Sequence, residues 1–120
     1  MPPHITGPVW LQGPIEGVPD LLQPVAHALV EAAQDVRALL ATMTPDETWT
    51  RPHGAASVGF HVRHSMGSLD RLLTYARGEA LSETQLATLA AEKTMNSGPG
   101  GAGELSGVFD AAIDRALDQL

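Results

Sequence analysis

The chain has no cysteine, few aromatic residues and half as many basic as acidic side chains. Seven Lys and Arg residues stand against fourteen Asp and Glu residues, which gives a formal net charge of −7 at pH 7. The lack of cysteine excludes disulfides, thiolate metal ligands and a cysteine nucleophile. The sequence shows no basic patch of the kind that marks a nucleic-acid-binding surface, and an acidic chain suits an anionic membrane poorly. We therefore expect neither a nucleic acid nor a membrane as partner.

Long apolar runs are also missing. None approaches the roughly 20 residues that a membrane-spanning helix needs. The first four residues, Met-Pro-Pro-His, do not resemble the basic region and apolar core of a signal peptide. With 120 residues, the chain is long enough for one domain with one core. These features predict a soluble cytoplasmic protein.

Alanine and leucine are abundant, whereas β-branched residues are sparse, and this composition favours an all-α fold. Ser57 and Ser82 are suitable N-caps, and Gly78 is a suitable C-terminal stop. Apolar residues recur at helical spacing in four segments. These segments cover about 20–43, 57–77, 82–93 and from 103 or 104 to 120.

The first 19 residues differ in composition from the rest, because they hold five of the nine prolines. Proline disfavours helix interiors and central strands, so residues 1–19 are predicted to form an extended arm. Residues 20–120 are predicted to form a single helical domain of the four-helix-bundle type. Residues 44–56 are expected to connect two helices, with Trp49 against the bundle. The glycine-rich residues 96–103 predict a linker, because no strand precedes them and no Gly-Lys-Ser/Thr follows.

Two of the five histidines suggest chemistry. His61 and His64 lie three residues apart near the start of a predicted helix, and imidazole is the commonest ligand for transition metals. Two histidines on adjacent turns can approach one ion. The helical wheel favours His61 as the more buried member; the alternative is a pair of partly buried structural histidines. His27 lies about 200° from the centre of its apolar stripe and is expected at the surface, and His4 and His53 are expected to face solvent.

Other catalytic patterns are absent from the sequence. It contains no His-Glu-x-x-His, no Gly-x-Ser-x-Gly and no pair of inward-facing carboxylates. Asp70 and Arg71 are interpreted as an ion pair at the surface. The histidines are therefore the only candidates for general acid–base chemistry.

The second predicted helix resembles that of the DinB/YfiT-like (damage-inducible) family of four-helix-bundle metalloproteins. The pattern is a loop, a Ser or Thr cap, a small apolar turn and a histidine seven residues after the cap, which is His64 here. The resemblance spans most of residues 8–120. It is clearest in residues 55–64 (AASVGFHVRH), 67–73 (GSLDRLL), 22–29 (LQPVAHAL) and 74–78 (TYARG).

The resemblance implies a divalent ion, zinc or nickel, held by three histidines. His64 matches the ligand on the second helix, whereas the His-x-x-x-His pair on the last long helix has no counterpart. Asp110, Asp114 and Asp118 lie on that helix instead. We therefore expect either a chain that is truncated at its C-terminus or a lost metal site. His61 and His27 are lesser candidates for further ligands, and a homodimer could complete the coordination.

Relatives in this family include transferases and isomerases that use low-molecular-weight thiols such as bacillithiol or mycothiol. The resemblance thus implies a stress-response enzyme, a thiol-dependent S-transferase or a hydrolase, acting on a small molecule. A bound metal would hold the cofactor thiol as a thiolate. The alternative interpretation is a non-catalytic helical module that has lost the metal site and mediates oligomerisation.

Overall fold

The computed structural model describes residues 7–94 and 102–120, and within these ranges the protein is all-helical, as expected. The described residues form five α-helices, which is one more than the sequence predicts, and no strand. The helices are α1 (Gln23–Leu40), α2 (Pro45–Trp49), α3 (Val58–Ala76), α4 (Glu83–Glu92) and α5 (Ala102–Gln119). Three short 3₁₀ turns accompany them: η1 (Val9–Leu11), η2 (Asp20–Leu22) and η3 (Pro52–Gly54).

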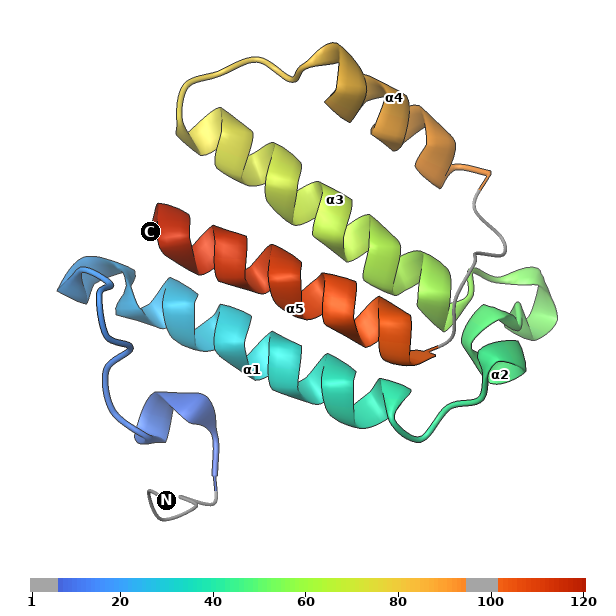
Figure 1. Ribbon diagram of the computed structural model, residues 1–120, viewed down its shortest axis with the longest axis horizontal. Coiled ribbons are helices and arrows are strands. Elements are labelled where there is room, and N and C mark those ends of the chain that lie inside the picture. Colours follow the sequence, from blue (N-terminus) through green and yellow to red (C-terminus); the bar gives the residue numbers. More distant parts are fainter. Residues whose placement is uncertain (1–6, 95–101) are drawn as a thin grey trace.

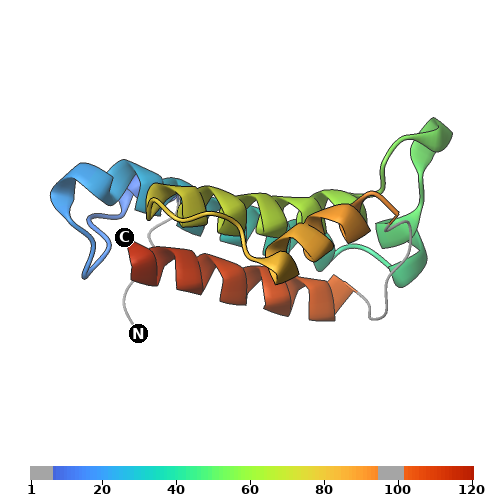
Figure 2. The same cartoon turned by 90° about the horizontal axis from the view of Figure 1, so that it is seen from above.

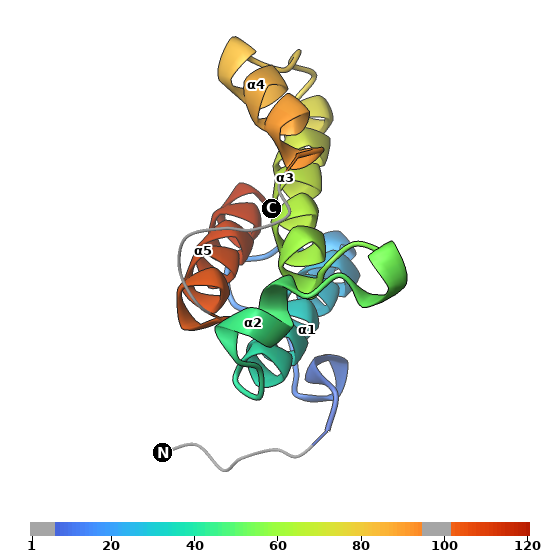
Figure 3. The ribbon, with the colours of Figure 1, turned by 90° about the vertical axis from the view of Figure 1, so that its right-hand side faces the viewer.

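Helices α1, α3 and α5 form the body of the protein. Figure 1 shows α3 and α5 side by side and parallel, with α1 antiparallel to both and α4 on the outer side of α3. In Figure 2, α5 lies to one side of the layer formed by α1 and α3. The end-on view in Figure 3 places the three long helices at the corners of a triangle, with α4 beyond α3. This arrangement is compatible with a helical bundle.

The core lies inside this triangle. Together with partly buried neighbours such as Leu29, Val36, Val58, Met66 and Leu69, each long helix contributes side chains spaced three or four residues apart, which puts them on one face. Burial of a Leu, Ile or Phe side chain stabilises the fold by about 1.5–3 kcal/mol. The buried core residues are Ala33, Leu40, Val62, Ala102, Leu105, Phe109 and Ile113.

Local capping signals determine several helix ends. The Ser57 hydroxyl accepts a hydrogen bond from the Phe60 backbone N–H at 3.0 Å, and Ser82 forms a capping box with Gln85. Gly78 follows α3 with a φ of +77°, a left-handed conformation that favours glycine. The predicted caps and stop of these two helices are therefore confirmed.

The segment between α1 and α3 differs from the prediction. Helix α1 ends at Leu40, three residues early, and α2 occupies part of the expected connection. Thr44 caps α2: its side chain accepts from the Glu47 N–H at 3.1 Å, and the Glu47 carboxylate accepts from the Thr44 N–H at 3.0 Å. This reciprocal pair fixes the first turn of a helix that has only five residues.

Residues 7–22 lie against α1. Val9 is buried, and its N–H donates to the Glu31 carboxylate at 2.9 Å. The Gln23 side chain bonds the backbone of Ile15 and Val18. His4 and most of the predicted glycine-rich linker lie outside the described residues. Among the described helices, none combines the length and apolarity that crossing a membrane would require.

Candidate functional site

Three side chains from α3 and α4 form a bonded group, which we call the His64 cluster: His64, Arg71 and Glu92. His64 Nδ1 lies 3.0 Å from Glu92 Oε2. Arg71 reaches both oxygens of the same carboxylate, with Nη1 2.9 Å from Oε1 and Nη2 3.3 Å from Oε2. One carboxylate therefore joins an arginine and a histidine of the neighbouring helix.

The cluster runs from the interior to the surface. The Glu92 side chain is only 6% exposed and that of Arg71 11%, whereas the His64 side chain is 49% exposed. A buried carboxylate is unfavourable unless it is paired and hydrogen-bonded, and Arg71 meets this need with the two N–H groups of its planar fork. The exposed end of the cluster is therefore the imidazole ring.

The protonation of the cluster follows from its charges. Burial raises the pKa of Glu92, but the hydrogen bonds from Arg71 and His64 outweigh burial and hold that pKa below its ordinary value. Glu92 is thus an ionised acceptor at neutral pH, and His64 Nδ1 must donate to it. In the neutral ring the lone pair then lies on Nε2, which bonds no other group within the described ranges. Phe60 stacks on the ring, with centroids 5.8 Å apart and planes 4° apart.

Gly67 makes this contact between α3 and α4 sterically feasible. It lies one turn after His64 and one turn before Arg71, so the three residues share a face of α3. A Cβ at this position would overlap the Glu92 carboxylate and lie 2.7 Å from Arg71 Nη1. The glycine therefore creates the space that Glu92 occupies.

Helix α4 is joined to α3 by polar groups at both of its ends. Near its start, the Gln85 amide donates to Asp70 Oδ2 and to Thr74 Oγ1, each at 2.8 Å. At its end, Glu92 binds Arg71 and His64. The predicted surface ion pair between Asp70 and Arg71 is therefore wrong: Arg71 is buried and pairs with Glu92, whereas Asp70 accepts from Gln85.

The other candidate histidines do not join His64 in a metal site. His61 is exposed, as His64 is, and its ring contacts Phe60 edge-on rather than the Glu92 carboxylate. His27 lies on α1, half-buried, with Nε2 2.8 Å from the Gly13 carbonyl oxygen. His53 is exposed in a left-handed turn. Within residues 7–94 and 102–120, no three His, Asp or Glu side chains converge as a metal site would require.

The three aspartates of α5 also lie apart from His64. Asp110 binds Arg37 of α1, with Nη2 2.6 Å from Oδ2, on the side of α5 that faces α1. Asp114 and Asp118 are exposed. These carboxylates are therefore not ligands that accompany His64.

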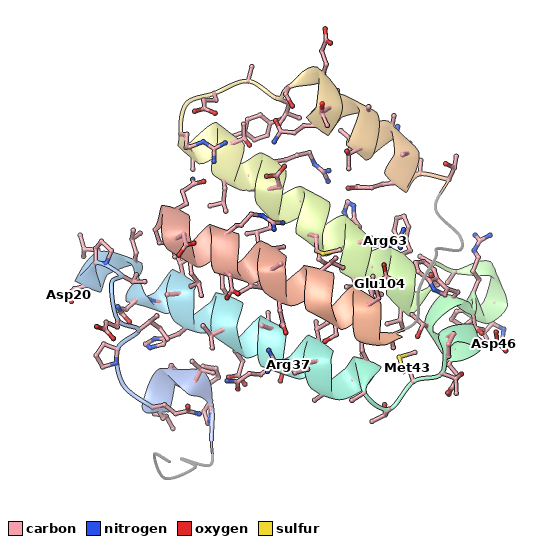
Figure 4. All side chains as sticks on the ribbon, in the orientation of Figure 1. Asp20, Arg37, Met43, Asp46, Arg63 and Glu104 are labelled. Carbon is pink, nitrogen blue, oxygen red and sulfur yellow. The ribbon has the colours of Figure 1, made fainter. Side chains whose placement is uncertain are left out.

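A cavity of about 390 Å³ adjoins the buried side of the cluster, between α3, α4 and α5. Its walls are mainly apolar and include Trp49 and Leu105, whereas Glu92, Arg63 and Glu104 supply charge. Figure 4 shows Arg63 toward the N-terminal end of α3 and Glu104 toward the N-terminal end of α5. Glu92 thus contacts both this cavity and His64, although sequence analysis singled out neither Glu92 nor the cavity.

No protein family model, curated protein or solved structure matches the chain. The resemblance to the DinB/YfiT-like family therefore rests on sequence patterns alone, in residues 22–29, 55–64, 67–73 and 74–78.

Proposed function

We propose that the protein is a metal-dependent enzyme of the DinB/YfiT-like type, with His64 Nε2 as one ligand of a divalent ion. The observation that carries this proposal is the bond from His64 Nδ1 to the buried Glu92 carboxylate. Histidines that ligate metals commonly donate their second ring nitrogen to a carboxylate, which fixes the ring and makes the ligating nitrogen more basic. The half-exposed ring leaves Nε2 for an ion.

The described residues supply this single ligand and not a complete site. Zinc sites use at least three protein ligands, and His61 and His27 do not converge with His64. Under the proposal, a second copy of the chain in a homodimer supplies remaining ligands. Imidazole suits both zinc and nickel. A bound ion would lower the pKa of a low-molecular-weight thiol, as an S-transferase needs, or of water, as a hydrolase needs.

Metal titration tests the ligand role directly. We expect zinc and nickel to bind the wild-type chain in calorimetric titrations, and His64→Ala to abolish that binding. His61→Ala is the matched control, because this exposed histidine lies on the same helix outside the cluster; it should leave the affinity unchanged. Negligible binding by the wild type, or equal binding by His64→Ala, would refute the proposal.

A second titration addresses the thiol. Nickel-loaded protein should develop a thiolate-to-nickel absorption band when bacillithiol or mycothiol is added, and an S-methylated analogue should not produce it. If metal binds without such a band, the thiol part of the proposal is wrong and a hydrolytic role for a metal-bound water is favoured.

A second candidate function is a non-catalytic helical module for association. The specific observation in its favour is the exposure of large apolar side chains at Leu72, Tyr75, Leu86 and Val108. Light scattering after size exclusion distinguishes the two proposals when it is combined with the metal titration. A dimer that forms without metal and binds none would favour the module, whereas a metal-free monomer would count against it.

A further inference from the structure

Glu92 occupies a position that helix energetics alone do not favour. It is the last residue of α4, where the negative end of the helix dipole disfavours a carboxylate. Its side chain is also buried, which disfavours the charge again. The hydrogen bonds of Glu92 with Arg71 and His64 of α3 must therefore offset the unfavourable helix dipole and the cost of burying the charge.

The contacts of Glu92 orient its carboxylate. Arg71 binds both oxygens, so rotation of the carboxylate about its last bond would break at least one of these hydrogen bonds. The Gln85 bonds to Asp70 and Thr74 hold the other end of α4 against α3. Oε2 is thus held on the side where His64 lies, and it meets Nδ1 at 3.0 Å.

From this geometry we infer that Glu92 is a positioning residue for His64: anchored by Arg71 in the space left by Gly67, it keeps the ring in the Nδ1–H tautomer and presents the Nε2 lone pair. The tautomer assignment rests on the structure alone, whereas the use of that lone pair for a metal rests on the proposed function. Arg71 acts only through Glu92, because its fork reaches the carboxylate and not the ring.

The tautomer can be measured without any metal. Long-range ¹H–¹⁵N correlation spectra of the metal-free protein, recorded where the histidines are neutral, distinguish a protonated ring nitrogen from a bare one. We expect His64 to show a protonated Nδ1 and a bare Nε2. His61 is the internal control, because its ring meets Phe60 edge-on and no carboxylate within the described residues, and it should show the mixture of a solvated imidazole with Nε2–H in excess. A His64 pattern that matches His61 would overturn the inference.

Glu92→Gln provides a sharper test. The substitution preserves the shape of the side chain but replaces one acceptor oxygen of the carboxylate with an NH₂ donor. Arg71 has only donors, so the Gln amide oxygen must turn toward it and the amide NH₂ toward His64. Nδ1 then has to accept, and we expect the ring to switch to the Nε2–H tautomer. An unchanged tautomer in a folded Glu92→Gln protein would also overturn the inference.

Gly67→Ala tests the space that Glu92 occupies. Its Cβ must displace the carboxylate, so His64 should acquire the same pattern as His61. Gly107→Ala is the matched control, because that glycine lies within α5 with no atom within 4 Å of an added Cβ; it should leave His64 unchanged. If either cluster variant fails to fold, the wild-type spectrum still decides.

The same experiments separate this inference from the proposed function. An Nδ1–H tautomer in a protein that binds no zinc or nickel would leave the positioning role standing and refute the metal role. The opposite result is metal binding that depends on His64, together with an Nε2–H tautomer of the His64 ring before metal is added. This result would support the metal role and refute the positioning role. Where both hold, Glu92→Gln should weaken metal binding by about 10- to 100-fold.

Discussion

Gly67 lies so close to the Glu92 carboxylate that a β carbon there would overlap this side chain. Glycine inside a helix is normally unfavourable by roughly 0.5–1 kcal/mol relative to alanine. Here the position of the Glu92 side chain accounts for a glycine in the middle of α3. The contact between these two residues therefore determines how a substitution at position 67 changes the stability of the protein.

Gly67→Ala should destabilise the protein, whereas Gly107→Ala should stabilise it. Both positions are helical, so alanine improves helix propensity by up to about 1 kcal/mol at each. At position 67 the overlap with Glu92 opposes this gain, and forced displacement of packed groups lowers stability by about 1–3 kcal/mol. Urea unfolding midpoints would show the opposite signs. Stabilisation by both substitutions would mean that α4 does not pack closely on α3.

Arg71→Met should destabilise the protein by about 3–5 kcal/mol, because it leaves the Glu92 charge buried without its main partner. The double variant Arg71→Met/Glu92→Met removes both charges and should recover most of that loss. Arg115→Met is the control on an exposed arginine and should change stability by less than about 0.5 kcal/mol. Additive losses in the double variant would show that Arg71 and Glu92 are not coupled.

Acid should weaken the cluster. The pKa of Glu92 is lowered in the folded protein, so the unfolded chain binds the proton more tightly and acid favours unfolding. The stabilisation is complete above the unfolded pKa, about 4.3, and is lost as the pH falls through the folded value. The stability advantage of the wild type over Glu92→Gln should therefore shrink as the pH falls from about 5 to about 3. The other carboxyl groups titrate in both proteins, so they do not change the difference in unfolding free energy between wild type and Glu92→Gln. If this difference stayed constant over the range, the lowered pKa of Glu92 would be contradicted.

Much of the fold could be predicted from the sequence because the relevant signals are local. Ser57, Ser82 and Gly78 mark helix ends through contacts within a few residues, and the helical spacing of apolar residues identifies the long helices. The capping box of α2 was equally local: Thr44 followed three residues later by Glu47 is a recognised helix start. Prolines at 45 and 52, at the start of this segment and just after it, favour a connection instead, and for this reason α2 is not predicted from the sequence.

The candidate site was harder to predict because its bonds join distant segments. Glu92 is 21 residues from Arg71 and 28 from His64, and no spacing rule within one helix connects them. A helical wheel considers one helix at a time, and the interpretation of Arg71 as a surface partner of its neighbour Asp70 likewise used α3 alone, so neither could include Glu92 of α4. Gly67 was the available signal, since a glycine within a helical pattern often marks close packing.

Trp49 packs against the N-terminal end of α3. Its ring packs on Gly59, where an added Cβ would lie 2.7 Å from two ring carbons, and the Arg63 guanidinium lies 5.1 Å from the ring centroid. Gly59→Ala must therefore displace the indole and expose it to water. In a Trp10→Phe background, which leaves Trp49 as the sole tryptophan, the fluorescence maximum should shift to the red.

Gly103→Ala in the same background is the control, because an added Cβ there meets no atom within 4 Å. It should leave the Trp49 emission unchanged. Because Trp49 also lines the cavity beside Glu92, its displacement should raise the accessibility of that cavity, which quenching by acrylamide would report. Identical emission and quenching in Gly59→Ala and Gly103→Ala would show that Trp49 does not pack on α3.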